Sequence, residues 1–193
     1  MTSPDPFADG VVDIGVTGAL RWADLGTQFP VAMGPFGPTF ADSGWISDEG
    51  ITENRETDST PFTPWQTNSP VRVATTSETL SWETVIWSST FDSISLWYKT
   101  KAADMTDTDD VISFVDGDIK DQDFHAFGID ILDGIKHRRF EIPKGEVTAR
   151  GSQTFKKGEL IGYPVTVTAY PGAEGWSVKR KFLNVFSLPA VTP

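Results

Sequence analysis

Few residues in this chain have side chains suited to catalysis. The two histidines, His125 and His137, lie 12 positions apart, and only His125 has a carboxylate, Asp123, close by in sequence. A histidine beside an aspartate can serve as a general base, but no motif for a nucleophile, a metal or a bound phosphate accompanies it. His137 stands in the basic run 136–139, where we expect a solvated strand residue. The sequence gives no positive support for an enzyme, and we expect no catalytic residue and no cofactor.

Carboxylates are abundant, with 27 Asp and Glu against 16 Lys and Arg. Residues 104–123 contain eight aspartates, a density that prompts a search for a calcium loop. An EF-hand loop needs acids at positions 1, 3 and 5 and a glycine at position 6. The segment DGD at 116–118 has its glycine second, and Lys120 takes the fifth position. We therefore interpret the stretch as a solvated acidic loop and expect no metal site, and no pair of carboxylates stands out for glycoside hydrolysis.

The charge balance limits the possible partners. A net charge of −11 disfavours tight binding to DNA or to an anionic membrane surface, since both require a basic face. Residues 1–97 hold three basic and 13 acidic side chains, whereas residues 98–193 hold 13 and 14. Such asymmetry can orient self-association. The chain has no cysteine, so disulfides and thiolate chemistry are excluded. No apolar run approaches the roughly 20 residues of a membrane span.

Composition and patterning favour a mainly β fold. The 23 aromatic residues argue against disorder, and 17 Gly with 13 Pro suit a loop-rich β protein. We expect one domain over 1–193 with an N-terminal arm at 1–13, built as a sandwich or rolled barrel of about eight strands with one flanking helix. The segments expected to form the strands after the acidic stretch are 124–132, 136–142, 146–150, 158–170 and 176–186.

The longest expected strand is Val71–Trp87. One of its faces is apolar (Leu80, Trp82, Ile86), whereas the other is small and polar, which is the period-2 pattern of a strand with one wet face. A helix is expected at 91–99, where apolar residues repeat at helical spacing after a capping serine, Ser88 or Ser89.

Residues 51–70 combine three prolines, many Thr, Ser and Asn, and the two aromatic residues Phe62 and Trp65. The stretch shows neither helical nor strand periodicity. A long segment of this kind inside a small domain is uncommon and usually functional. Two interpretations remain open: a floppy surface loop, or an ordered arm that docks on a neighbouring molecule through its aromatic anchors. The loop after the first strand and a turn at 47–50 complete the expected organisation.

Several segments, taken together and in order, resemble a known family. They are GVTGALRWADLGTQFP (15–30), GWISDEGITENRET (44–57), VRVATTSETLSWETVIWSSTFDSISLWY (71–98), FGIDILDGIKHRRFEIPKGEV (127–147) and GYPVTVTAYP (162–171). In this ordered set the chain resembles the major tail protein, or tail tube protein, of long-tailed siphovirus-type bacteriophages, particularly those of actinobacterial hosts. The Trp enrichment and the acidic 104–123 stretch depart from the family pattern.

The resemblance implies a structural virion protein without enzymatic activity. Subunits of this family form hexameric rings that stack helically into a tube, through which genome DNA passes without specific binding. The resemblance implies a tape measure protein, a tail terminator and baseplate or tip proteins as further partners, and assembly in the host cytoplasm without a membrane. The family's inter-ring arm maps onto 51–70, with Arg55, Phe62 and Trp65 as contact residues. We expect the wet face of the long strand to line the lumen through Thr75, Ser77, Thr79 and Glu83.

An alternative function from another class stays open at the sequence level. A carbohydrate-binding β-sandwich uses exposed tryptophans as platforms for sugar rings. Trp45, Trp65 and Trp176 would serve in that role here.

Overall fold

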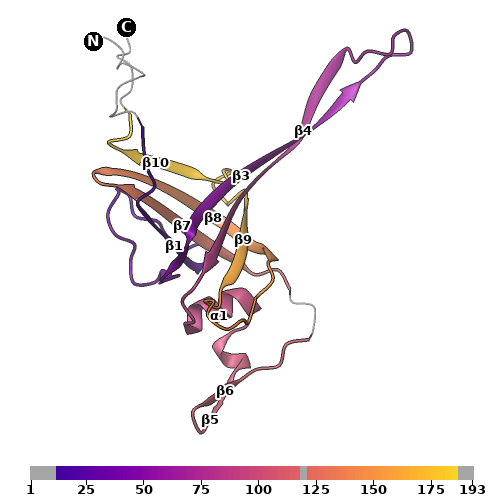
Figure 1. Cartoon of the computed structure of the whole chain (residues 1–193). Helices are drawn as coiled ribbons and strands as arrows, with labels where there is room; N and C mark the ends of the chain where they lie inside the picture. Colours follow the sequence, from indigo (N-terminus) through magenta and orange to yellow (C-terminus); the bar gives the residue numbers. More distant parts are fainter. Residues whose placement is uncertain (1–11, 118–120, 187–193) are drawn as a thin grey trace.

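The computed structural model describes residues 12–117 and 121–186, so most of the predicted N-terminal arm (1–13) lies outside the described residues. Antiparallel strands dominate these ranges (Figure 1). The elements in chain order are β1 (Thr17–Asp24), β2 (Ala41–Asp42), β3 (Ile46–Phe62), β4 (Arg72–Ile86), α1 (Phe91–Tyr98), the 3-10 helix η2 (Ala102–Asp104), β5 (Thr106–Thr108), β6 (Val111–Ser113), β7 (Phe124–Asp133), β8 (Lys136–Arg150), β9 (Tyr163–Tyr170) and β10 (Lys179–Leu183).

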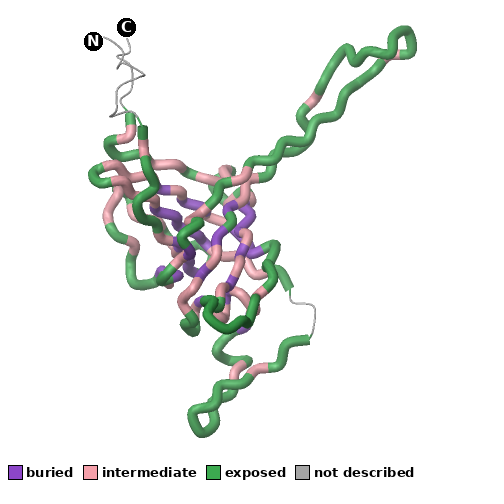
Figure 2. Tube along the Cα trace, viewed as in Figure 1, coloured by how far each residue is buried: buried purple, intermediate pink, exposed green. Residues whose placement is uncertain are grey.

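Eight of the strands form one sheet in the order β2-β1-β7-β8-β9-β4-β3, with β10 added alongside β8. The sheet rolls up, so that Cα atoms of β1 and β3, near its opposite ends, approach within 8 Å. Buried residues concentrate inside this roll (Figure 2). The main core is apolar and draws on β1, β4, α1, β7, β8 and β9. The expected fold class, mainly β with about eight strands and a flanking helix, is confirmed.

Strand β8 was expected as two short strands, 136–142 and 146–150, but it is one strand of 15 residues. Its first half pairs with β10 and its second half with β9. The register against β7 shifts between these halves, where His125 faces Gly145 and Phe127 faces Ile142. A register shift of this kind bends a strand and increases its twist. The bend lets one continuous strand serve two different neighbours, which local patterning does not reveal.

The outer face of β7 is also covered, although one face of an antiparallel sheet often remains solvated. A second cluster gathers Phe29, Phe36 and Phe40 from the β1–β2 connection against Ala126 of β7. Gly128 permits this approach, because a Cβ atom there would lie 2.3 Å from the Phe36 ring. The connection therefore packs as part of the fold.

Helix α1 begins after Thr90, whose hydroxyl accepts a hydrogen bond from the Ser93 amide at 3.2 Å. The expected cap, Ser88 or Ser89, was wrong by one or two residues; Ser88 instead accepts a bond from the Trp45 amide. Trp97 ties the helix to the sheet by donating to the Pro164 carbonyl oxygen at 3.1 Å. Among the described residues, no helix has the length and apolar character needed to cross a membrane.

Candidate assembly surfaces

The most prominent surface feature is a hairpin that projects from the rolled sheet (Figure 1). Strand β4 pairs with β9 only from Leu80 to Ile86, whereas β3 and β4 remain paired out to Phe62 and Arg72. Beyond Leu80, the two strands therefore have only each other as sheet partners among the described residues. We call this projection, residues 55–79, the arm.

The arm corrects the interpretation of 51–70 as a stretch without strand structure. Residues 51–62 belong to β3, and only the nine residues 63–71 connect it to β4. The expected turn at 47–50 is a bulge within β3, because Ile46 faces Ile86 and Ile51 faces Thr84. Period-2 alternation arises when one strand face is buried. Nearly every arm residue is exposed on both faces, so the sequence there shows no alternation (Figure 2).

Polar contacts hold the arm together. Arg55 pairs with Glu78 at 2.8 Å, and Ser77 donates a hydrogen bond to the Asp58 carboxylate at 2.8 Å. Thr76 is an extra residue in β4 at this point, and its hydroxyl donates to the Asp58 carbonyl oxygen at 3.2 Å. An exposed ion pair contributes about 1 kcal/mol or less. Because the arm has no further strand partner in the body beyond Leu80, it gains little stability from its own subunit. Isolated hairpins are only marginally stable in water.

Two predicted contact residues lie near the arm tip. The side chain of Trp65 in the connecting loop is 99% exposed, and Phe62 at the end of β3 is 52% exposed. Arg55 lies at the base of the arm, where Leu80 faces it across the hairpin. The loop surrounding Trp65 carries no charge from residue 59 to residue 71. The arm thus presents an uncharged tip with a large exposed aromatic ring.

The four predicted lumen residues do not share one location. Glu83 lies on the body of the sheet, exposed, and accepts a hydrogen bond from Asn54 at 2.9 Å. Thr75, Ser77 and Thr79 are exposed as well, but they lie on the arm. The bulge at Thr76 also interrupts the alternation on which their common face was predicted. On the body of the sheet, the alternation of buried and exposed residues in β4 holds as expected. The buried residues there are Trp82, Thr84 and Ile86.

Two edges of the rolled sheet are available for further pairing. Strand β3 has β4 as its only sheet neighbour among the described residues, and the β1 edge is covered only by the two-residue strand β2. These edges border a groove of about 1080 Å³, which Trp45 also lines. Free edges present backbone donors and acceptors that pair readily with another strand.

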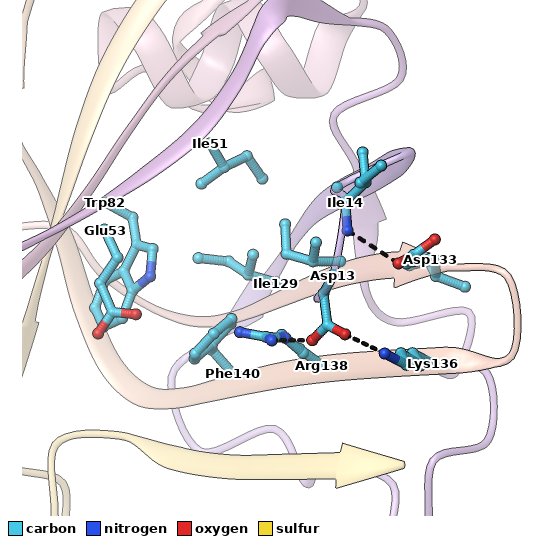
Figure 3. Close-up of a pocket in the computed structure, with 13 residues that line it drawn as sticks. Asp13, Ile14, Ile51, Glu53, Trp82, Ile129, Asp133, Lys136, Arg138 and Phe140 are labelled. Carbon is cyan, nitrogen blue, oxygen red and sulfur yellow. Dashed lines mark hydrogen bonds and ion pairs between the residues drawn. The ribbon is translucent and has the colours of Figure 1, made fainter. Parts of the chain in front are cut away.

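A smaller apolar slot, of about 240 Å³, opens between β3 and the β7–β8 hairpin (Figure 3). Its floor and walls are apolar; they comprise Ile51, Trp82, Ile129, Ile131 and Phe140. At one side of its rim, Asp13 forms ion pairs with Lys136 and Arg138, and the Ile14 amide donates to Asp133 at 2.9 Å.

The charges around the slot neutralise one another. The pKa of the Asp13 carboxyl lies below its usual value. The hydrogen bond from Lys136 has the largest effect, and the hydrogen bond from Arg138 adds to it. Glu53 forms an ion pair with Arg180 of β10. The contacts of Asp13 and Ile14 fix the N-terminal segment to the β7–β8 hairpin.

A buried charge cluster that the sequence analysis missed lies on the outer face of β7. Asp130 accepts two hydrogen bonds from Arg139, at 2.6 and 3.0 Å, and Arg21 approaches it at 3.1 Å. His137 lies 2.8 Å from the same carboxylate. Arg139 also donates to the Gly34 carbonyl oxygen at 2.7 Å. The cluster therefore anchors the β1–β2 connection to the sheet.

His137 was predicted to be solvated, and that prediction was wrong, since its side chain is 13% exposed. The only signal for the cluster was an acid and a base at facing positions of one hairpin, Asp130 and Arg139. His125 does contact Asp123, with 3.0 Å between Nε2 and Oδ2, and this hydrogen bond lowers the pKa of Asp123. Neither residue lines the slot or the groove.

The acidic stretch contains a second projecting hairpin, β5–β6 (Figure 1). Its turn residues, Asp109 and Asp110, have φ of 53° and 64°, as a type I′ turn requires. Aspartate tolerates positive φ better than most residues. Within the described ranges, no group of three or more His, Asp or Glu side chains is arranged to hold a metal ion.

Comparison with known proteins identifies the family of this chain. A search of curated proteins finds no match. A chain in the cryo-EM structure of the anti-feeding prophage (AFP) baseplate, 6-fold symmetrised, is similar at 8% identity and a TM-score of 0.37, covering 96% of this chain and 99% of that one. This similarity is too weak to support an inference about assembly. A family model described as phage tail tube protein matches residues 7–181. The chain therefore belongs to the phage tail tube protein family and is a structural protein of the virion tail.

Proposed function

We propose that this protein assembles with itself into hexameric rings, and that these rings stack into the tube of a phage tail. The observation that carries the proposal is the projecting arm, which exposes Phe62 and Trp65 far from the core of its own subunit. From Arg55 to Phe62 the arm extends roughly 23 Å, taking 3.3 Å per strand residue. We propose that a projection of that length bridges two stacked rings.

The free edges of β1 and β3 support ring closure. Antiparallel pairing of one subunit's edge with the next would satisfy the exposed backbone groups and join the sheets around a common axis. A closed ring leaves no free edge, whereas an open chain of subunits would retain two.

The net charge suits a channel that conducts DNA without binding it. Two unit charges 10 Å apart in water interact by only about 0.4 kcal/mol. Six subunits of net charge −11 carry about 66 formal negative charges per ring, and their summed field discourages DNA from adhering. We assign Glu83, on the body of the sheet, to the lumen side. For Thr75, Ser77 and Thr79, which lie on the arm, the lumen position stays a prediction from the sequence. We propose no enzymatic role for the chain.

The remaining partners follow from this role. A tube requires a protein that sets its length, a terminator and a baseplate or tip, and we propose these as partners in a siphovirus of an actinobacterial host. Assembly in the host cytoplasm belongs to the same proposal.

Electron microscopy of the purified protein over a concentration series tests this function. Hollow tubes or stacked rings are expected, with sedimentable mass appearing above a critical concentration. Discrete particles that shift their melting temperature with a panel of sugars would instead favour the carbohydrate-binding alternative. Trp45 is 80% exposed and lies just before β3, on the body of the subunit, whereas Trp65 lies at the arm tip. The two indole side chains therefore do not form one sugar-binding platform.

A further inference from the structure

We propose that the apolar slot between β3 and the β7–β8 hairpin receives the arm tip of a second copy of this chain, with Trp65 as the inserted side chain. This inference rests on the proposed function, because it requires subunits to meet in an assembly. It adds the receiving surface, which neither the family nor the arm identifies.

The slot has the size and chemistry for an aromatic ring. A cavity of about 150 Å³ holds benzene, so the slot volume of about 240 Å³ suffices for an indole. Its lining includes Ile51, Ile129 and Phe140, which offer apolar contact on several sides (Figure 3).

One buried polar atom in the slot lacks a partner. Trp82 is 2% exposed, and its indole nitrogen has no hydrogen-bond partner among the described residues. Figure 3 shows this nitrogen on the side of the ring that faces the slot. Buried polar groups are nearly always hydrogen-bonded. This nitrogen is inaccessible to solvent in the single subunit, so a carbonyl oxygen of the incoming loop can bond to it only when the slot opens around the loop.

Charge selects the occupant. The rim charges already have partners: Asp13 pairs with Lys136 and Arg138, Glu53 pairs with Arg180, and Asp133 accepts a hydrogen bond from the Ile14 amide. A charged partner would lose solvation here without gaining a counter-ion. The arm tip fits this requirement, because residues 59–71 are uncharged.

The other fully exposed apolar side chains fit less well. Among the described residues, three large apolar side chains are at least nine-tenths exposed: Val31, Trp65 and Val115. Only Trp65 is aromatic and lies on the arm. Because the arm extends away from its own body, the slot it enters belongs to another copy (Figure 1).

Photo-crosslinking in assembled full-length protein tests the contact directly. Trp65→p-benzoylphenylalanine keeps an aromatic ring at the tip and bonds to nearby C–H groups on irradiation. We expect cross-linked peptides between copies to map to β3, β4, β7 or β8 around the slot. If tubes form but the residue at position 65 cross-links outside the slot, or does not cross-link to another copy, this inference is overturned. The proposed function would still stand in that case. Absence of tubes from the unsubstituted protein as well would count against both.

A blocking variant gives a second measurement. Gly15 borders the slot, and a Cβ atom there would lie 3.7 Å from Ile131, an ordinary contact. Gly15→Leu, whose Cβ the subunit accommodates, is chosen to occupy the slot, and we expect at least a tenfold rise in critical concentration with an unchanged melting temperature. Because Gly15 also borders the groove beside β1, the cross-linking result decides which of the two surfaces the substitution blocks. Gly37→Leu, at an exposed site outside both cavities, is the matched control and should leave assembly unchanged. Equal effects of the two substitutions would contradict the assignment.

Discussion

The buried charge cluster predicts a large loss of stability from one isosteric change, Asp130→Asn. The carboxylate of Asp130 receives Arg139 at 2.6 and 3.0 Å and Arg21 at 3.1 Å, and the Arg139 side chain is 2% exposed. Without the carboxylate, the buried guanidinium has no counter-charge. Removing one partner of a buried pair costs about 3–5 kcal/mol. At roughly 2–4 °C per kcal/mol for a domain of this size, the melting temperature should fall by roughly 6–20 °C.

The assay is thermal and urea unfolding of unassembled protein at low concentration, since assembly would stabilise the folded state by mass action. Glu78→Gln provides the matched control, because it removes one partner of the exposed Arg55 pair and should cost less than about 1 kcal/mol. The double variant Asp130→Leu/Arg139→Met removes both buried charges and should be less destabilised than Asp130→Asn alone. A loss under 1 kcal/mol for Asp130→Asn, or equal losses at the buried and exposed pairs, would refute this reasoning.

Three further outcomes are expected. Trp65→Ala should leave the melting temperature unchanged and impair tube formation; unfolding of the subunit would instead place this ring in a core. The pKa of Asp13 is lowered in the folded protein. Its stabilising effect should therefore be present above the ordinary carboxyl pKa and be lost as the pH falls through the folded-state pKa. Asp13→Asn should reduce this loss of stability at acidic pH, measured as the free energy of unfolding at several pH values. Gly128→Ala should cost about 1–3 kcal/mol in urea unfolding, because its Cβ would meet the Phe36 ring, whereas the same change at Gly117, in open space, should have little effect.

The body of the sheet could be predicted from sequence because its strands have one buried face. In β4, the alternation from Leu80 to Ile86 matches the face that packs into the core, over the same residues that pair with β9. The hairpin between β7 and β8 was indicated by Asp133-Gly134, and Gly134 adopts φ of 57° in the turn. Both signals are local, so a single sequence is enough to read them.

The arm could be noticed but not described correctly from sequence. Residues 55–62 are strands only because 72–80 lie opposite, and neither side packs on a core that would impose a period. Likewise, the slot depends on β3, β4, β7 and β8 meeting in three dimensions, and Trp82 gave no sign that its nitrogen would face a cavity. The slot depends on pairing between distant segments, which no short sequence window contains. The two strands of the arm are neighbours in sequence, but they lack the buried face that would give a periodic signal.

The arm has a consequence for how assembly depends on salt. Interactions between exposed charges weaken with added salt, with a Debye length of about 8 Å at physiological ionic strength, whereas apolar burial does not weaken in this way. The arm tip carries no charge between residues 59 and 71, while the whole subunit carries −11. Repulsion between subunits should therefore decline with salt as the docking of Trp65 persists. On the proposed docking of the arm tip, raising the ionic strength should therefore favour the tube, because it weakens the repulsion between strongly acidic subunits.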